Sequence, residues 1–167
     1  MRKIKIEKNF YKMYHIHHIK MENVYTKWKG DNGMRQRVIG ETGFAPFTGV
    51  GIFIKGSTAI LRSVDDTYYY DDNLDNMDNP TYTLFGHNGD QSIDERRFNE
   101  PLLNPDKTTD IYLYRRIPNR RKPNKTSLYI WYGKYEIVGR NTQPHRGRDG
   151  TMRNIIVLSL RRIIPRL

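Results

Sequence analysis

Short apolar runs separated by turn-forming residues dominate the chain from residue 50 onward. Glycine, proline, asparagine and aspartate lie between the runs, and each run has the length of a strand rather than of a helix. The pattern therefore indicates a β-rich protein. Strands are predicted at Val50–Ile54, Ala59–Leu61, Tyr82–Phe85, Ile111–Tyr114, Leu128–Tyr132, Tyr135–Val138 and Ile155–Leu160.

The remaining segments predict helices and loops. Residues 1–30 have a loosely helical spacing of apolar residues, which predicts a short helix, and Asp31–Gly33 is a turn signal. Residues 90–103 are polar and end before a proline, so a helix or an irregular segment is expected there. The prolines and charges of residues 115–125 favour an exposed hairpin loop between two strands. The expected fold class is therefore α+β.

Length and composition limit the type of protein. A chain of 167 residues suits one domain with a self-supporting core. The sequence has no cysteine, which excludes disulfides, thiolate zinc sites and a cysteine nucleophile, so an intracellular protein is expected. The sequence also lacks an apolar run long enough for a membrane-spanning helix or a secretory signal, and a soluble, unprocessed protein without a membrane partner is expected.

The net charge of +11 is unevenly distributed. Residues 1–63 carry +8, residues 64–110 carry −9 and residues 111–167 carry +12. Basic surfaces attract polyanions through counterion release, so nucleic acid is the leading partner class, with an anionic membrane surface second. A merely solvated basic surface is the alternative. Phosphates would repel the acidic middle segment, so its carboxylates are expected to point into a pocket or away from the nucleic acid.

Catalytic and metal-binding patterns are not supported. His15, His17 and His18 lack a carboxylate at ligand spacing, and Asp71–Tyr82 departs from a calcium loop at its glycine and glutamate positions. Glu136 has no lysine two residues further on, as a Glu-x-Lys nuclease core would require. We therefore expect no enzyme, no metal and no cofactor. A nuclease of unrecognised type remains a third interpretation.

Three groups of motifs occur in order over residues 44–163. The first comprises Gly49–Ile52, Ala59–Ser63 and Tyr69–Asn76; the second comprises Leu84–Gln91, Asn99 and Leu102; the third comprises Ile111–Arg116, Trp131–Val138 and Ile156–Arg162. Together they resemble the SRA (SET and RING associated) family, also called YDG, which recognises modified cytosine in DNA. Tyr132 replaces the aspartate of the name-giving motif. Only residues 87–89 separate Gly86 from Asp90, so the resemblance is to the short form without the basic finger loop.

The resemblance implies a twisted open barrel, PUA-like or SRA-like, with a few short helices. Residues 1–43 would form a basic N-terminal extension with a short helix, and residues 44–167 the SRA-like β-barrel domain. The implied base pocket takes Asp72 or Asp71 as the carboxylate and Tyr69 or Tyr70 as one stacking wall. Phe85 or Tyr82 is the second wall, because Leu84–Gly86 stands where the family has Tyr-Thr-Gly.

Physical chemistry is consistent with such a pocket. A protein that reads one cytosine must extrude it, stack it between aromatic rings and satisfy its polar edge. An aspartate accepts a hydrogen bond from the N4 amino group of cytosine, which gives the acidic segment a use in a basic protein. Most protein–DNA hydrogen bonds go to the backbone, so a phosphate-binding role is assigned to the cations. These are Arg115, Arg116, Arg120, Arg121, Lys122, Lys125, Arg146 and Arg148.

The expected function is therefore that of a non-catalytic module that reads modified cytosine, such as 5-methylcytosine, in double-stranded DNA by base flipping. The alternative is a structural or interaction protein of a viral, chromatin or RNA-containing assembly that keeps the fold without reading bases. DNA is the expected partner; charge does not distinguish it from RNA, and partner proteins are expected in the alternative. The expected location is the nucleus in a eukaryote and otherwise the cytoplasm or a virion.

Overall fold

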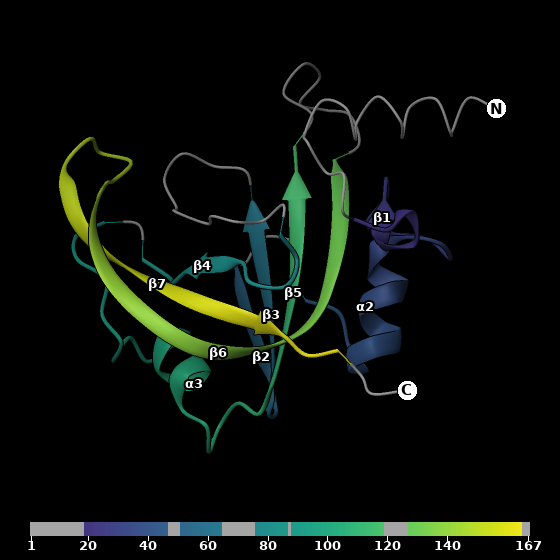
Figure 1. Cartoon of the computed structure of the whole chain (residues 1–167), viewed down its shortest axis with the longest axis horizontal. Helices are drawn as coiled ribbons and strands as arrows, with labels where there is room; N and C mark the ends of the chain where they lie inside the picture. Colours follow the sequence, from purple (N-terminus) through teal and green to yellow (C-terminus); the bar gives the residue numbers. More distant parts are fainter. Residues whose placement is uncertain (1–18, 47–50, 65–75, 87, 119–126, 165–167) are drawn as a thin grey trace.

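The computed structural model describes the residues 19–46, 51–64, 76–86, 88–118 and 127–164. These residues form one mixed sheet with short helices around it (Figure 1). The elements are η1 (Met21–Asn23), β1 (Val24–Tyr25), α2 (Met34–Thr42), β2 (Ile52–Lys55), β3 (Thr58–Val64), β4 (Thr81–Thr83), α3 (Asn99–Leu103), β5 (Asp110–Ile117), β6 (Leu128–Arg146) and β7 (Met152–Arg162).

The sheet is an open barrel with the strand order β2-β3-β5-β6-β7-β4, and β1 pairs with the start of β6. Strands β3 and β5 are parallel, and the other neighbours are antiparallel. The connection between β3 and β5 contains β4 and α3. Strands β2 and β4 form the two ends of the strand order, so the expected α+β open-barrel fold is confirmed.

Strand β6 holds the sheet together because it pairs with β5 along its first part and with β7 along its second part. It curves strongly between the two partners (Figure 1). The register shifts opposite Leu113 and Tyr114, where Tyr132 is the extra residue and Gly133 has a φ of +94°, and shifts again around Val138. An extra residue in one strand increases bending and twist, so these bulges explain the curvature.

Alternating side chains of the central strands build two cores. On β5, Ile111, Leu113 and Ile117 point into the inner core of the curved sheet. Tyr112 and Tyr114 point to the other face, where they pack in an outer core. Helix α2 covers this outer core, as its position beside the sheet in Figure 1 shows.

Helix α2 was not predicted from the sequence. It follows the predicted turn at Asp31–Gly33 and buries Met34 and Val38, which lie four residues apart on one side. Gly43 ends the helix in a left-handed conformation, with a φ of 78°, and donates its N–H to the carbonyl of Ile39 at 2.8 Å. Residues of the predicted N-terminal extension thus pack directly on the barrel.

Other segments match the predictions to different degrees. Of the helix predicted within residues 1–30, residues 1–18 lie outside the described chain, and residues 21–25 form η1 and β1 instead of an α-helix. The two strands predicted at residues 128–132 and 135–138 are one strand, β6. The pairing of Ile117 with Leu128 confirms the hairpin, but the prediction that its exposed loop begins at Arg115 is wrong, because residues 115–117 pair with β6 as part of β5 and Arg115 and Ile117 are buried. Residues 119–126 of the loop lie outside the described ranges. No helix of the described ranges is long and apolar enough to cross a membrane.

Candidate nucleic-acid interface

Tyr82 spans the open seam of the barrel. It lies on β4, at one end of the strand order, and only 4% of its surface is exposed. Its hydroxyl donates a hydrogen bond to the carbonyl oxygen of Gly51 at 2.8 Å and lies 3.5 Å from the carbonyl oxygen of Arg62. Gly51 precedes β2 and Arg62 belongs to β3, at the other end of the strand order. Tyr82 therefore connects the two edges that the open sheet leaves apart.

The acidic segment begins close to this seam. Strand β3 ends at Val64, two residues after Arg62. The predicted pocket residues Tyr69, Tyr70, Asp71 and Asp72 lie outside the described residues. The chain is described again from Asn76, where the carbonyls of Met77, Asp78 and Pro80 accept hydrogen bonds from Tyr135, Arg162 and Leu160, respectively. Both ends of the segment are thus anchored on the same sheet as Tyr82.

Phe85, the other predicted stacking residue, lies in a different environment. Its half-buried ring packs on Phe98 with ring centroids 4.6 Å apart and an angle of 59° between the planes. Its backbone N–H and carbonyl are both bonded to the side chain of Asn99, at 2.9 Å each. Tyr82 approaches Gly51 and Arg62, whereas Phe85 packs beside α3. Of the two candidates for the second wall, Tyr82 is thus the one that approaches β3, at Arg62.

Two amide side chains from the family-like motifs hold the segment after β4. Gln91 donates to the carbonyls of Leu84 at 2.6 Å and Gly86 at 3.3 Å, and accepts from the N–H of Ile156 at 2.7 Å. Fully buried Asn99 bonds both backbone groups of Phe85 and also the carbonyl of Ser92 at 2.9 Å. The guanidinium of Arg153 donates to the carbonyl of Gly86 as well.

Sequence reasoning did not recognise these positioning roles of Gln91, Asn99 and Arg153. An apolar environment makes an unbonded amide costly, so a buried asparagine or glutamine normally holds backbone groups. The available signal was the place of both amides in the second group of motifs, Leu84–Gln91 with Asn99. They fix the path of residues 84–86 and thereby the position of Tyr82 on β4.

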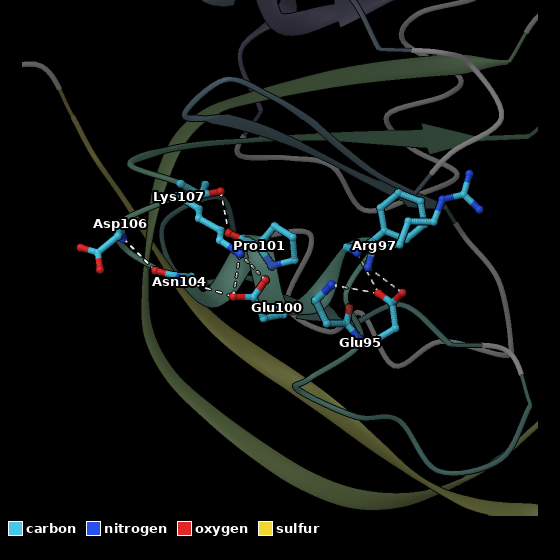
Figure 2. A network of polar contacts seen from close by, with 10 residues as sticks. Glu95, Arg97, Glu100, Pro101, Asn104, Asp106 and Lys107 are labelled. Carbon is cyan, nitrogen blue, oxygen red and sulfur yellow. Dashed lines mark hydrogen bonds and ion pairs between the residues drawn. The ribbon is translucent and has the colours of Figure 1, made fainter.

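A polar network holds α3, which carries Asn99, in place (Figure 2). The carboxylate of Glu95 accepts hydrogen bonds from the N–H groups of Arg97 at 2.9 Å, Phe98 at 2.8 Å and Asn99 at 3.1 Å. Burial opposes the charge, but these bonds lower the pKa of Glu95 overall. Glu100 binds Lys107 at 2.8 Å, which ties the helix to the turn that follows it. The network is structural and orients Asn99 towards Phe85.

Asp90 anchors the same loop to β7. Its carboxylate accepts hydrogen bonds from the backbone N–H of Asn154 at 2.6 Å and from the side-chain amide of Asn154 at 3.2 Å. These two bonds lower the pKa of Asp90 below its ordinary value of 3.8. The contact is exposed. Its two hydrogen bonds favour the ionised form of the Asp90 carboxylate.

Asp90→Asn is expected to lower the unfolding temperature at pH 6 and to have a progressively smaller effect as the pH falls towards 2. A carboxylate with a lowered folded-state pKa stabilises the protein above its unfolded pKa, and this contribution is lost as the pH falls through the folded value. Thermal unfolding of both proteins across this pH range measures the difference. An equal loss at every pH would show that the charge of Asp90 does not contribute.

The cations assigned to phosphate binding differ in exposure. Arg115 is 8% exposed, lies beside Ser63 in the strand register and shares a face with Leu113. Arg116 points to the other face, and its Nε donates to the hydroxyl of Ser127 at 3.0 Å. Arg120, Arg121, Lys122 and Lys125 lie outside the described residues.

Arg146 and Arg148 are exposed at the far end of the β6–β7 ribbon. The ribbon curves away from α2, and its tip lies on the opposite side of the molecule (Figure 1). The turn is ordered by Asp149, which accepts hydrogen bonds from the N–H of Thr151 at 3.0 Å and its hydroxyl at 2.7 Å. Of the eight predicted phosphate ligands, these two are the described residues that lie on an open surface.

Within the described ranges, no group of three or more histidine, aspartate or glutamate side chains could hold a metal ion. Glu136, which the nuclease interpretation would use, accepts a hydrogen bond from Nε of Arg161 at 2.7 Å. This ion pair gives the side chain a structural contact on the surface of the β6–β7 ribbon.

No protein-family model and no curated protein sequence matches the chain. Solved structures do match. KRYPTONITE in complex with mCHH DNA, an H3(1–15) peptide and SAH has a TM-score of 0.57 at 19% identity, over 89% of this chain and 33% of that one. Its complex with mCHG DNA and SAH has a TM-score of 0.55 at 20% identity, with the same coverage. The modification dependent TagI restriction endonuclease has a TM-score of 0.50 at 17% identity, over 90% of this chain and 52% of that one.

The chain thus spans about a third of the length of KRYPTONITE and about half that of TagI. At these identities the likeness concerns the path of the backbone and not the activity. It agrees with the architecture described above, a curved, open, mostly antiparallel sheet with few short helices. The chain has the fold of an SRA domain.

Proposed function

We propose that this chain binds double-stranded DNA and takes an extruded modified cytosine into a pocket between the Tyr69–Asp72 segment and Tyr82, without catalysing a reaction. The position of Tyr82 carries the proposal. Its hydroxyl lies within hydrogen-bonding distance of the carbonyls of Gly51 and Arg62, close to the end of β3 from which the acidic segment starts. An aromatic ring thus lies close to the end of β3, after which the sequence continues to Tyr69–Asp72.

Charge supports the same function. Residues 64–110 carry −9 within a chain of net charge +11. A carboxylate in a pocket accepts a hydrogen bond from the amino group of a flipped cytosine, while exposed cations bind phosphates. Arg146 and Arg148 provide two such cations at the ribbon tip. The fold is also shared with KRYPTONITE, which has been crystallised with mCHG DNA.

Equilibrium binding tests the proposal directly. Matched duplexes containing cytosine, 5-methylcytosine or 5-hydroxymethylcytosine are compared at two salt concentrations, with single-stranded DNA and RNA alongside. A preference of about tenfold or more for one modified duplex corresponds to about 1.4 kcal/mol and supports base reading. Equal binding to all duplexes would contradict it.

Asp72→Ala is expected to weaken binding to the preferred modified duplex by about 1–3 kcal/mol and to leave non-specific binding nearly unchanged. Asp78→Ala is the matched control, because Asp78 is an exposed carboxylate beyond the same segment. Equal losses on modified and unmodified DNA with Asp72→Ala would contradict the pocket assignment.

Replacing Arg120 and Arg121 by alanine should instead weaken binding to all duplexes alike and reduce the salt dependence of binding.

The alternative function, a structural component without base reading, rests on the packing of the two aromatic rings. Tyr82 is buried and hydrogen-bonded to the backbone, and Phe85 packs on Phe98. These are also the contacts of ordinary barrel aromatics. Uniform, salt-sensitive binding to every nucleic acid in the same experiment would favour this role.

A further inference from the structure

A second basic site lies on the outer face of the sheet. A partly open cavity of about 350 Å³ is lined by six residues from four parts of the chain. They are Trp28, Lys29, Arg62, Tyr114, Arg116 and Tyr129. Small-molecule sites take about 300–1,000 Å³, so the cavity is large enough for a compact ligand.

The strand register brings these side chains together. Arg62 pairs with Tyr114 across β3 and β5, and Arg116 pairs with Tyr129 across β5 and β6. Tyr114 and Arg116 alternate with the inward-facing Leu113, Arg115 and Ile117. The cavity therefore lies on the opposite face of the sheet from the inner core that contains Tyr82.

Backbone hydrogen bonds hold the segment with Trp28 and Lys29 against α2. The carbonyls of Lys27 and Trp28 accept hydrogen bonds from the N–H groups of Met34 and Arg35, each at 2.8 Å. Gly33 fits closely here, because a Cβ at this position would lie 2.9 Å from the carbonyl oxygen of Lys29. These contacts position Trp28 and Lys29 at the cavity.

The chemistry of the lining favours an anion with a ring attached. The six described lining residues supply three cations and no carboxylate. The ring of Trp28 lies 5.4 Å from that of Tyr114 and 5.6 Å from that of Tyr129, which forms an aromatic wall. Burial raises the pKa of Tyr114, so its hydroxyl remains protonated and able to donate.

Arg116 is oriented for binding. Its Nε is bonded to Ser127 at 3.0 Å, which uses one of the five N–H donors of the guanidinium and restrains its plane. A restrained guanidinium matches the oxygen geometry of a phosphate, and aromatic side chains stack on nucleobases.

We propose that this outer cavity binds the phosphate of a nucleotide through Lys29, Arg62 and Arg116, with the nucleoside against Trp28 and Tyr129. The nucleotide is either free or part of a nucleic-acid strand. The site is separate from the proposed base pocket and does not depend on it.

Calorimetric titration of the full chain tests the site, with tryptophan fluorescence as a second readout. Both tryptophans of the sequence belong to the outer core, so they report binding there. The probes are cytidine 5′-monophosphate, inorganic phosphate and a single-stranded oligonucleotide. Lys29→Gln and Arg116→Gln are each expected to weaken binding about tenfold, as the loss of one charged hydrogen bond implies. Lys27→Gln is the matched control, since exposed Lys27 lies two residues away and does not line the cavity.

Binding of cytidine 5′-monophosphate with this pattern of variants identifies a free nucleotide as the ligand. The same pattern with the oligonucleotide alone identifies a nucleic-acid strand. Inorganic phosphate binding as tightly as the nucleotide would overturn the nucleoside part of the assignment. Binding that is equally sensitive to Lys27→Gln, or absent with every probe, would overturn the site.

Lys29 is exposed, so Lys29→Gln gives a result even if Arg116→Gln unfolds the protein. Asp72→Ala should leave this binding unchanged, which separates the site from the base pocket.

Discussion

Trp131→Ala is expected to lower the free energy of unfolding by about 4 kcal/mol, within the range found when a large aromatic residue is removed from a core. Trp131 lies on β6, is 2% exposed and stacks on Tyr112 with ring centroids 5.8 Å apart. It also belongs to the outer core together with Met34 and Val38 of α2. Alanine would leave a cavity where the helix and the sheet meet.

Urea denaturation followed by circular dichroism measures this loss. Domains of this type have a total stability of about 5–15 kcal/mol, so the variant would be marginal at moderate temperature. Met152→Ala on β7 is the control, because Met152 is 61% exposed and its loss should change stability by no more than about 0.5 kcal/mol. A loss below about 1 kcal/mol for Trp131→Ala would contradict the packing of α2 on this face.

Asn99→Ala is expected to lower the free energy of unfolding by about 3 kcal/mol, because each buried backbone group left without a partner costs about 1–3 kcal/mol. The side chain of Asn99 bonds the N–H and carbonyl of Phe85 and the carbonyl of Ser92, and none of its surface is exposed. Water entering the gap would recover part of the loss. The same variant should also weaken any binding that depends on the position of β4.

The same denaturation experiment tests this, with Asn141→Ala as control. Asn141 is exposed on β6, and its side chain makes one long contact of 3.5 Å with Gln143. Its replacement should leave stability nearly unchanged. If both variants lose the same small amount, the buried amide does not hold the loop.

Local patterns were sufficient to locate five of the seven described strands. Apolar residues between turn-forming residues located β2 to β5 and β7, because strand formation leaves a short, nearby signal in the sequence. The position of α2 had no such signal. Only Met34 and Val38 of its nine residues are buried, and Gly40 lies inside it, so the apolar stripe is too narrow to identify. The sheet supplies the surface that stabilises this helix.

The sequence did not predict that β6 is one continuous strand, because the strand contains a bulge. Gly133 resembles a turn residue in the sequence, and the interrupted pattern predicted two strands where there is one. The pairing partners on both sides keep the strand extended through the bulge. The end of β6 was missed as well, because residues 139–146 are polar and form strand only by pairing with β7.

The candidate site, like the strands, was predictable from the sequence only in part. Composition and motif order were enough to indicate an SRA-like fold, a basic surface and an acidic tyrosine-rich segment, since these properties need no knowledge of long-range contacts. They did not distinguish Tyr82 from Phe85, or Arg115 from Arg116. Tyr82 is placed at the seam by strand β4, which pairs with the distant β7.

Arg115 and Arg116 are neighbours of equal charge, yet one is buried beside Ser63 and the other lines the outer cavity. Successive residues of a strand point to opposite faces, so their roles differ only once the sheet has an inside and an outside. Long-range strand pairing creates that distinction, and with it the two sites proposed for this protein. The residue types were readable from the chain, but the face on which each one acts depends on contacts between segments far apart in the sequence.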